Sequence, residues 1–366
     1  MLASQLLELL PQQWQLLLVI LPLVSLLFLL HRCRNRSGSI RLPPGPWQLP
    51  ILGNLHQIGP LAHRSLLVLS KRHGPVMMLR VGMVQTVVLS SPEAAREALK
   101  THNVDCSGRS PSAGPRLLSY GYKDVIFSPY GEYVQEMRKL FILELLSRRR
   151  VQAACYARDA QDTFVAGNDT SAITINWAMA ELIRHPRVLK KVQEEIRTAV
   201  GKKERVQNED MSKLNYLRMV VKETLPLRIP AALLVPRETL QKIQIAGYDI
   251  PAKTRVIVNA WAIARDPNVW KEAEEFYPER FEDTDIDFNG AHFELLPFGS
   301  GRRICPGMDM GVANVEFILA NMLYCFNWEL PPGMNIEDLS MEEEGALTIR
   351  KKTPLMLVPT RYTTYQ

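Results

Sequence analysis

Apolar residues near the C-terminus recur with the period of an α-helix. They fall on one face of a helix that is predicted to begin at Pro306, where the missing N–H of proline costs no hydrogen bond. The apolar positions of this face are Met308, Val312, Val315, Leu319 and Met322.

Shorter patterns predict the other elements of the chain. Helices are predicted over residues 92–100, 129–147, 157–185, 186–200 and 211–225. Runs rich in β-branched residues predict strands over 76–82 and 84–89, a turn at Gly82-Met83, and a strand-rich stretch over 232–258 with a turn at Ala246-Gly247. The fold class is therefore mainly α with a small β-sheet region, and the chain contains no internal repeat.

Residues 14–30 are apolar except for Gln15 and Ser25, and they would span about 26 Å as a helix. We predict a transmembrane anchor there. Four basic side chains follow within residues 31–36, whereas residues 1–13 contain no lysine or arginine, so the short N-terminus is predicted to be lumenal and the rest cytosolic. A cleaved signal peptide is the alternative interpretation. Residues 31–46 then form a basic, proline-rich linker, and residues 47–366 form the folded domain.

Composition narrows the function classes. The chain has 366 residues, of which 46% are hydrophobic and 22% charged, as in ordinary globular proteins. The net charge is +6, and the one basic run is Arg148–Arg150, so nucleic-acid binding is not predicted. Five dispersed cysteines with no Cys-x-x-Cys pair argue against a disulfide framework and a zinc site, and favour a reducing compartment.

The most informative segment is the ten residues Phe-Gly-Ser-Gly-Arg-Arg-Ile-Cys-Pro-Gly at 298–307. It places Cys305 just before the predicted helix, where free N–H groups are expected to lower the thiol pKa and favour the metal-binding thiolate. Gly301 and Gly307 allow a tight turn and the approach of a flat partner, and Arg303 is placed to meet an anionic group on it. A buried apolar cysteine or a phosphate nest are the alternatives.

Five residues of this segment are spaced as in the signature of the cytochrome P450 family, the heme-thiolate monooxygenases, which the chain therefore resembles. They are Phe298, Gly301, Arg303, Cys305 and Gly307. The resemblance implies a cytochrome P450-like fold, heme b (iron protoporphyrin IX) as cofactor and Cys305 as the ligand of its iron. It covers about residues 40–150 and 160–360, including a proline-rich hinge at Leu42–Pro46.

A second motif lies in the predicted helix over 157–185. The run Ala166-Gly167-Asn168-Asp169-Thr170 resembles the oxygen-activating motif of the family. The resemblance implies that Asp169 and Thr170 pass protons to bound dioxygen, and that Ala166 and Gly167 leave room for it beside the helix. An ordinary helix cap is the alternative.

The resemblance also implies three cationic partners for the heme propionates, namely Arg138, Arg237 and Arg303. The family often has a tryptophan four residues before the first of these, where this chain has Val134.

A further resemblance concerns a structural pair, Glu223 and Arg280. In the family, the glutamate also meets an arginine three residues later, but Pro226 stands at that position here. Pro226 is expected to break the helix, so Arg228 is not expected to substitute for the missing arginine.

The largest departure from the family is an internal deletion near residues 151–163, where the family has several additional helices, two of them covering the substrate channel.

The resemblance is strongest to plant microsomal members of secondary metabolism. These act on small lipophilic substrates in the endoplasmic reticulum membrane, with electrons from an NADPH-cytochrome reductase. Docking candidates for the reductase are Arg302, Lys139 and Arg148. The alternative is a membrane-anchored, catalytically inactive remnant that binds heme weakly or not at all.

Overall fold

The computed structural model describes residues 40–119, 121–146, 161–345 and 347–363, together with the single positions 20, 22 and 24. The chain divides into two units, Met1–Arg41 and Leu42–Gln366, and the elements below belong to the second. Apart from the three single positions, the predicted anchor at residues 14–30 lies outside the described residues. Within the described ranges, no helix is both long enough and apolar enough to span a bilayer.

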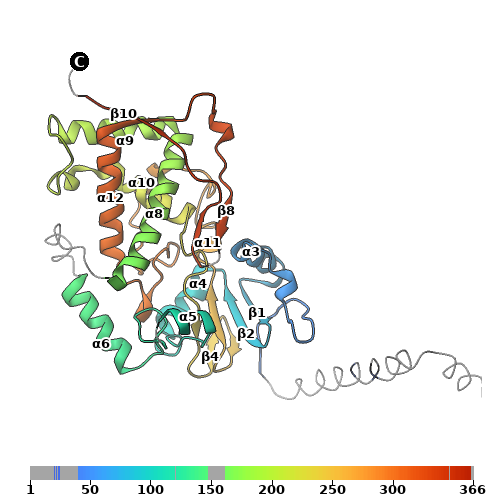
Figure 1. Ribbon diagram of the computed structural model, residues 1–366. Helices are drawn as coiled ribbons and strands as arrows, with labels where there is room; N and C mark the ends of the chain where they lie inside the picture. Colours follow the sequence, from blue (N-terminus) through green and yellow to red (C-terminus); the bar gives the residue numbers. More distant parts are fainter. Residues whose placement is uncertain are drawn as a thin grey trace, which may run out of the picture. The chain divides into compact units, whose positions relative to one another are not determined.

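The second unit is mostly helical (Figure 1). Among its described residues the α-helices are α3 (Ala62–His73), α4 (Pro92–Arg96), α5 (Ala113–Leu118), α6 (Glu132–Leu140), α8 (Gln161–Arg184), α9 (Pro186–Val200), α10 (Asn215–Leu227), α11 (Ala260–Ile263) and α12 (Met308–Cys325). Two π-helical turns, Glu97–Thr101 and Phe141–Leu145, continue α4 and α6. Short 3-10 turns lie at Leu55–Gln57, Asp210–Lys213, Pro278–Phe281, Gly301–Arg303 and Ile336–Asp338.

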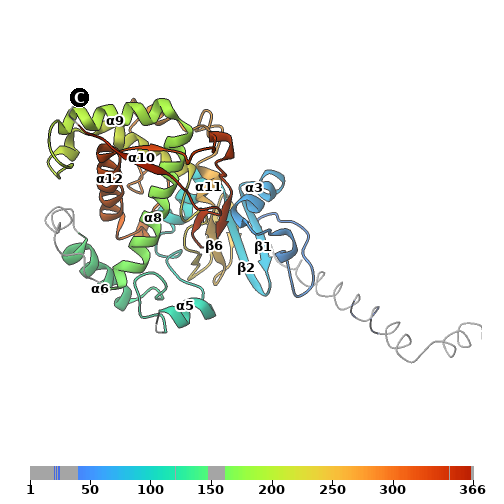
Figure 2. The same cartoon turned by 45° about the horizontal axis from the view of Figure 1, so that its top comes forward.

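One of the two largest hydrophobic clusters of the described residues lies among α8, α9, α10 and α12. Figures 1 and 2 both show α8 and α12 side by side. Helix α9 illustrates why the sequence folds in this way, because its buried residues recur at nearly every fourth position and so form one apolar face. These residues are Val188, Val192, Ile196 and Val200.

The second core lies around a four-stranded sheet with the order β1-β2-β6-β3. Its strands are β1 (Val76–Val81), β2 (Val84–Leu89), β3 (Arg237–Glu238) and β6 (Arg255–Val258). The β1–β2 hairpin turns at Gly82-Met83, as predicted, and β2 runs parallel to β6. Three two-stranded sheets complete the fold: β4 (Ile243–Ile245) with β5 (Tyr248–Ile250), β7 (Phe326–Glu329) with β10 (Val358–Arg361), and β8 (Glu343–Gly345) with β9 (Ile349–Lys351).

Several predicted boundaries were wrong. The predicted helices over 92–100 and 129–147 are each a shorter α-helix followed by a π-helical turn, and the helix predicted over 211–225 begins at Asn215. The structure describes the helix predicted over 157–185 from Gln161 to Arg184, whereas residues 157–160 lie outside the described residues. Helix α10 includes Pro226 and ends one residue later, since a proline in the last turn leaves the preceding turns intact.

Candidate functional site

The predicted signature forms a closed loop in front of α12. The N–H of Cys305 donates to the carbonyl of Phe298 at 2.9 Å, which closes the loop. The ring of Phe298 meets that of Phe288 edge-on at 5.5 Å and anchors the loop on the helical core. The Cys305 side chain at its end is exposed.

Two expectations about Cys305 were wrong. The helix begins at Met308 with Gly307 at its N-cap, so Pro306 does not occupy the first helical position. Although Cys305 keeps an exposed surface, the protein atoms packed around its thiol desolvate it and raise its pKa, and the N–H of Gly307 and the Arg138 guanidinium oppose this effect only in part. The thiolate is therefore not favoured by the protein alone. Coordination to a metal cation favours it.

Gly301 allows the loop to pack closely against the backbone of the turn that follows α4. Its φ is +69°, and a Cβ at this position would lie 2.2 Å from the carbonyl oxygen of Leu99, in the π-helical turn that follows α4. The next N–H, of Arg302, donates to Asn103 Oδ1 at 2.7 Å. A Cβ at Gly307, by contrast, would meet no atom of the described residues within 4 Å. Gly301 is therefore required for backbone packing, and Gly307 leaves space open beside Cys305.

Gly301→Ala is expected to destabilise the chain by about 3 kcal/mol, because it adds left-handed strain and a backbone clash. The matched control is Gly311→Ala in α12, where an added Cβ meets nothing within 4 Å of it among the described residues. This control is expected to be neutral or stabilising by up to about 1 kcal/mol. Urea unfolding of both variants measures the difference. Equal free energies of unfolding would contradict the role given to Gly301.

The three arginines predicted near the propionates all reach this loop or its neighbours. Arg138, on α6, donates to the carbonyl of Ile304. Arg237, on β3, donates to the carbonyl of Ser300 at 2.6 Å. Arg303 donates to two carbonyls outside the loop, those of Ser107 at 3.0 Å and Ser128 at 2.8 Å.

A fourth arginine, Arg109, was missed by the sequence analysis. It donates to the carbonyls of Ile126, Val235 and Pro236 at 2.7–2.9 Å. Burial lowers the pKa of Arg109, and the charges of the other three arginines, which lie nearby, lower it as well. The sequence shows it only as one arginine in a polar turn, so no local signal identified it. We call Arg109, Arg138, Arg237 and Arg303 the arginine cluster.

The arginine cluster carries more positive charge than the protein around it neutralises. Burial, together with repulsion from neighbouring guanidinium groups such as that of Arg138, lowers the pKa of Arg237 and of Arg303 to about 10. Asp124 is the one carboxylate, among the described groups, that opposes these shifts within the arginine cluster. In the same described ranges, the buried Nη1 atoms of Arg237 and Arg303 have no hydrogen-bond partner. Buried, unneutralised donors of this kind fit an anionic ligand, and the two propionates of heme meet that requirement.

The other predicted motif lies in α8, which packs beside α12. Thr348, at the tip of the β8–β9 hairpin, donates to Asp169 Oδ2 at 3.4 Å. Thr170 follows on the same helix, and its carbonyl accepts from the hydroxyl of Thr174 at 2.9 Å. Ala166 and Gly167 belong to the first turns of α8. Asp169 is thus hydrogen-bonded to the β8–β9 hairpin, whereas Arg138 and Arg237 are hydrogen-bonded to the loop that carries Cys305.

Glu223 and Arg280 form a buried ion pair, with Arg280 Nε 2.9 Å from a carboxylate oxygen of Glu223. Glu223 also accepts from the N–H of Tyr277 at 2.9 Å. Burial raises the pKa of Glu223 to about 7, against the opposing effect of Arg280. Arg228 does not take the place of the missing arginine, because it pairs with Glu181 at 2.7 Å and with Glu343 at 3.4 Å.

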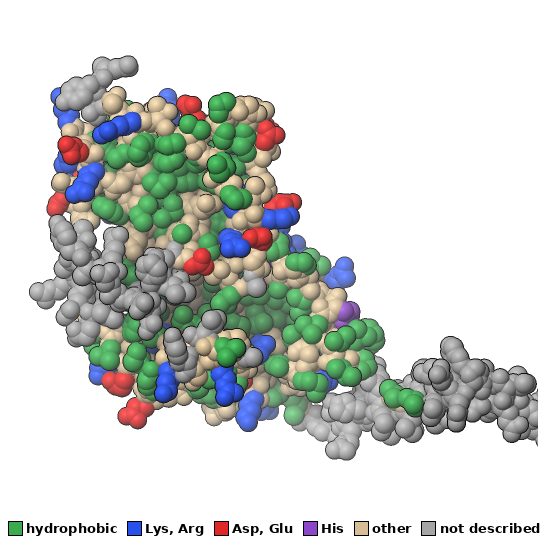
Figure 3. Space-filling model, in the orientation of Figure 1, with side chains coloured by type: hydrophobic (Ala, Val, Ile, Leu, Met, Phe, Trp, Pro, Cys, Tyr) green, Lys and Arg blue, Asp and Glu red, His purple; other side chains and the backbone are tan. Residues whose placement is uncertain are grey.

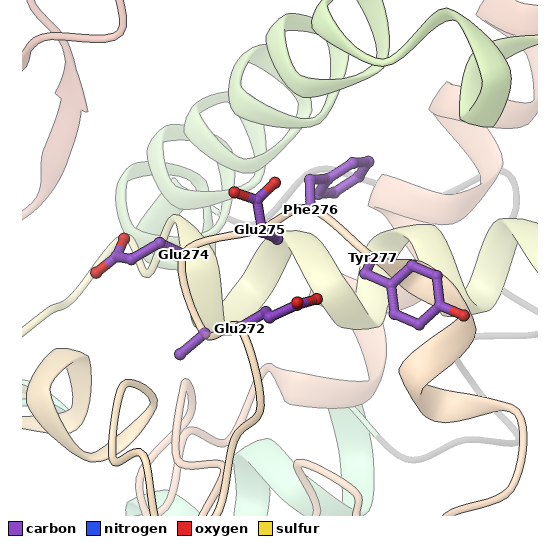
Figure 4. Close-up of a pocket in the computed structure, with 6 residues that line it drawn as sticks. Glu272, Glu274, Glu275, Phe276 and Tyr277 are labelled. Atoms are coloured by element: carbon purple, nitrogen blue, oxygen red, sulfur yellow. The ribbon is translucent and has the colours of Figure 1, made fainter.

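Two hollows of the surface help to locate the site. In Figure 3 the surface is hollowed between the helical part at the top and the part that carries α5, and hydrophobic side chains gather around this hollow. A separate hollow of about 520 Å³ is lined by the six residues Glu272–Tyr277 (Figure 4), and its three glutamates point in different directions. None of the predicted site residues lines this second hollow, so we do not assign the chemistry to it.

Comparisons with known proteins identify relatives of this chain. The family model described as Cytochrome P450 matches residues 43–161 and 156–357. The chain is 44% identical to 4-hydroxyphenylacetaldehyde oxime monooxygenase of Sorghum bicolor, with 96% of each chain covered. It is 37% identical to cytochrome P450 71B23 of Arabidopsis thaliana, covering 90% of this chain and 95% of the relative. It is 34% identical to 2-methylbutanal oxime monooxygenase of Manihot esculenta, covering 96% and 98%.

The comparisons also show where the chain is shorter. The alignment with the Sorghum relative runs over 511 positions and covers 96% of both chains, although this chain has only 366 residues. The missing positions are therefore internal, and the two family matches meet at residues 156–161. A solved zebra fish cytochrome P450 with abiraterone has the same fold, with a TM-score of 0.71 at 20% identity over 82% of this chain and 100% of that one. The cysteine loop, the fold and these relatives together show that the chain belongs to the cytochrome P450 family.

Proposed function

We propose that this chain is a heme-dependent monooxygenase that inserts one atom of dioxygen into a small lipophilic substrate. The observation that carries the proposal is the arginine cluster beside the Cys305 loop. Its four guanidinium groups face one carboxylate, and two buried Nη1 atoms have no partner among the described residues. A dianionic cofactor such as heme b would supply the missing charge and acceptors.

Residues of the loop and of the arginine cluster would each hold a different part of the cofactor. Cys305 Sγ would ligate the iron, and the N–H of Gly307 would stabilise the charge on the sulfur. Arg138, Arg237 and Arg303 would bind the propionates, with Arg109 completing the arginine cluster. Phe298, Gly301 and Gly307 would shape the cradle. When bound, the heme supplies the one-electron and dioxygen chemistry that side chains lack.

On helix α8, the Asp169 carboxylate and the Thr170 hydroxyl would hold protons and pass them to the oxygen atom that leaves as water. Ala166 and Gly167, one turn earlier on α8, would leave space beside the helix. The hydrogen bond from Thr348 holds Asp169 at the hairpin tip.

Two relatives are named as oxime monooxygenases, so oximes of small aldehydes are the first substrates to test. The proposed electron donor is an NADPH-cytochrome reductase, docking on the exposed Arg302 and Lys139; the third candidate, Arg148, lies outside the described residues. The proposed location is the endoplasmic reticulum membrane, with one span at residues 14–30 and the folded unit in the cytosol.

The test is the spectrum of the purified, reduced chain under carbon monoxide. Heme bound through a thiolate gives a red-shifted Soret band, which we expect to see. Oxime turnover with reductase, compared with peroxide release, then measures how much of the reducing power reaches the substrate. A chain without heme absorbance, or with the band of a neutral ligand, would be the inactive remnant instead.

A further inference from the structure

The β8–β9 hairpin is hydrogen-bonded to helix α8 at two points. Thr348, near the tip of the hairpin, donates to the carboxylate of Asp169 at 3.4 Å. The next residue along, Ile349, accepts at its carbonyl from the indole N–H of the buried Trp177 at 3.4 Å, so β9 also packs on α8 (Figure 1). The position of the hairpin on α8 therefore decides whether the hydroxyl of Thr348 reaches Asp169.

The segment that follows helix α10 holds the hairpin in this position. The N–H of Ile349 donates to the carbonyl of Pro230 at 2.7 Å. Two residues before Pro230, Nη1 of Arg228 lies 3.4 Å from a carboxylate oxygen of Glu343, the first residue of β8. The Nε of the same guanidinium donates to Glu181 of α8 at 2.7 Å. Arg228 thus bridges α8 and the base of the hairpin.

The two carboxylates that Arg228 bridges are buried, with side chains of Glu181 and Glu343 only 1% and 2% exposed. Glu343 also pairs with Arg64 at 2.8 Å, and His185 lies 3.6 Å from Glu181. Among the described residues, Arg228 is the one side chain that forms an ion pair with both carboxylates. Without this cation, two buried negative charges on α8 and β8 would repel each other and push the hairpin away from the helix.

We propose that Arg228 is a positioning residue for proton delivery, because it holds the β8–β9 hairpin on α8 and so keeps the Thr348 hydroxyl on the Asp169 carboxylate. The proposal deepens the proposed function and rests on the role given there to Asp169. A carboxylate that is held by a fixed hydroxyl keeps one orientation, whereas a freed carboxylate turns and delivers its proton less selectively.

The products report this difference. Two electrons and two protons enter the reaction with each dioxygen in either case. In the productive reaction, one oxygen atom enters the substrate and the other leaves as water. When protons arrive out of place, both oxygen atoms leave together as hydrogen peroxide. The ratio of peroxide released to oxime consumed therefore measures how well Asp169 is positioned.

The first measurement is amide hydrogen exchange of the full chain, which reports on the hairpin with or without a cofactor. Arg228→Met removes the charge, and Arg228→Lys keeps the charge without the flat guanidinium, which lies 4.7 Å from the ring of Trp177. We expect Arg228→Met to speed exchange about ten-fold at the N–H of Ile349 and in the turn of α8 that carries Asp169. Arg228→Lys is expected to restore part of the protection.

The matched control for exchange is Arg197→Met. Arg197 is also a half-buried arginine, but it donates to the carbonyl of Phe326 at 3.3 Å and to Asn327 at 2.7 Å, which both belong to β7. The control is expected to leave exchange in β8 and β9 unchanged.

The second measurement is the ratio of peroxide to oxime turnover, expressed per heme from the carbon monoxide band. Thr348→Val removes the hydrogen bond to Asp169 at a solvent-accessible position and leaves Arg228 in place, so the fold is retained. We expect Thr348→Val and Arg228→Met each to raise the ratio several-fold. The double variant is expected to match Arg228→Met alone, since both changes act through one hydrogen bond.

Unchanged exchange in Arg228→Met would overturn the proposal, as would faster exchange with an unchanged peroxide ratio. An equal rise of the ratio in Arg197→Met, or additive effects of Thr348→Val and Arg228→Met, would show that Arg228 acts by general loosening instead. A chain without the thiolate band would refute the proposed function separately. Faster exchange around Asp169 in Arg228→Met would then still support the positioning by Arg228, and unchanged exchange would overturn it.

Discussion

Replacing Cys305 with serine is expected to abolish the red-shifted Soret band of the reduced chain under carbon monoxide. Serine is nearly isosteric with cysteine, but its hydroxyl does not ionise near neutral pH and cannot act as the thiolate ligand. The loop should survive, because the hydrogen bond to Phe298 comes from the backbone of residue 305. Oxime turnover is expected to fall to background together with the band.

The control for this prediction is Cys325→Ser. Cys325 is a free, half-buried cysteine at the other end of α12. The Cys325→Ser variant is expected to keep both the band and the turnover of the unchanged chain. If Cys305→Ser kept the red-shifted band, another thiol would have to be the ligand, and the assignment of the loop would be wrong.

The free energy of unfolding is expected to depend strongly on pH through Glu223. Its folded-state pKa of about 7 lies above the ordinary value of 4.5, because burial disfavours the charged carboxylate and Arg280 offsets this effect only in part. Between these two pH values the folded chain binds more protons than the unfolded chain, so Glu223 makes stability fall as the pH rises. Over this window the loss is about 3 kcal/mol. Urea unfolding at pH 5 and pH 8 is expected to show it, and Glu223→Gln is expected to remove most of it.

Arg280→Leu provides the complementary measurement. Above pH 7 it leaves the Glu223 carboxylate buried without its cation, which is expected to cost about 3–5 kcal/mol. At pH 5 the carboxyl is neutral, and the loss is expected to be smaller. The same loss at both pH values would show that Arg280 acts through its carbonyl contacts with Lys271, Glu272 and Glu275, not through Glu223.

Local patterns predicted the elements whose folding depends on local chemistry. Ser91 caps α4 and Pro92 begins it, the hairpin turns at Gly82, and α9 begins and ends where its apolar face does. The π-helical turns after α4 and α6 were not predicted, since nothing in the apolar period distinguishes them from an α-helix.

The site was predicted where residues are consecutive and missed where they are distant in sequence. The spacing around Cys305 identified the loop, but the raised thiol pKa depends on atoms brought from other elements. Arg109 lies almost two hundred residues before the loop, and only the folded chain brings its charge to Arg303. The ion pairs of Arg228 could not be predicted for the same reason, because its partners Glu181 and Glu343 belong to α8 and β8.

If the arginine cluster holds the heme propionates as proposed, the cofactor is also a folding ligand. Its positive charges repel one another, Asp124 offsets them only in part, and a bound anionic ligand would neutralise the remainder. A ligand that binds the folded state alone stabilises it by about 2.7 kcal/mol at a free concentration one hundred times its dissociation constant. When heme is scarce, the empty chain would unfold more often and reach the proteases of the cell. The amount of this protein would then follow the supply of heme.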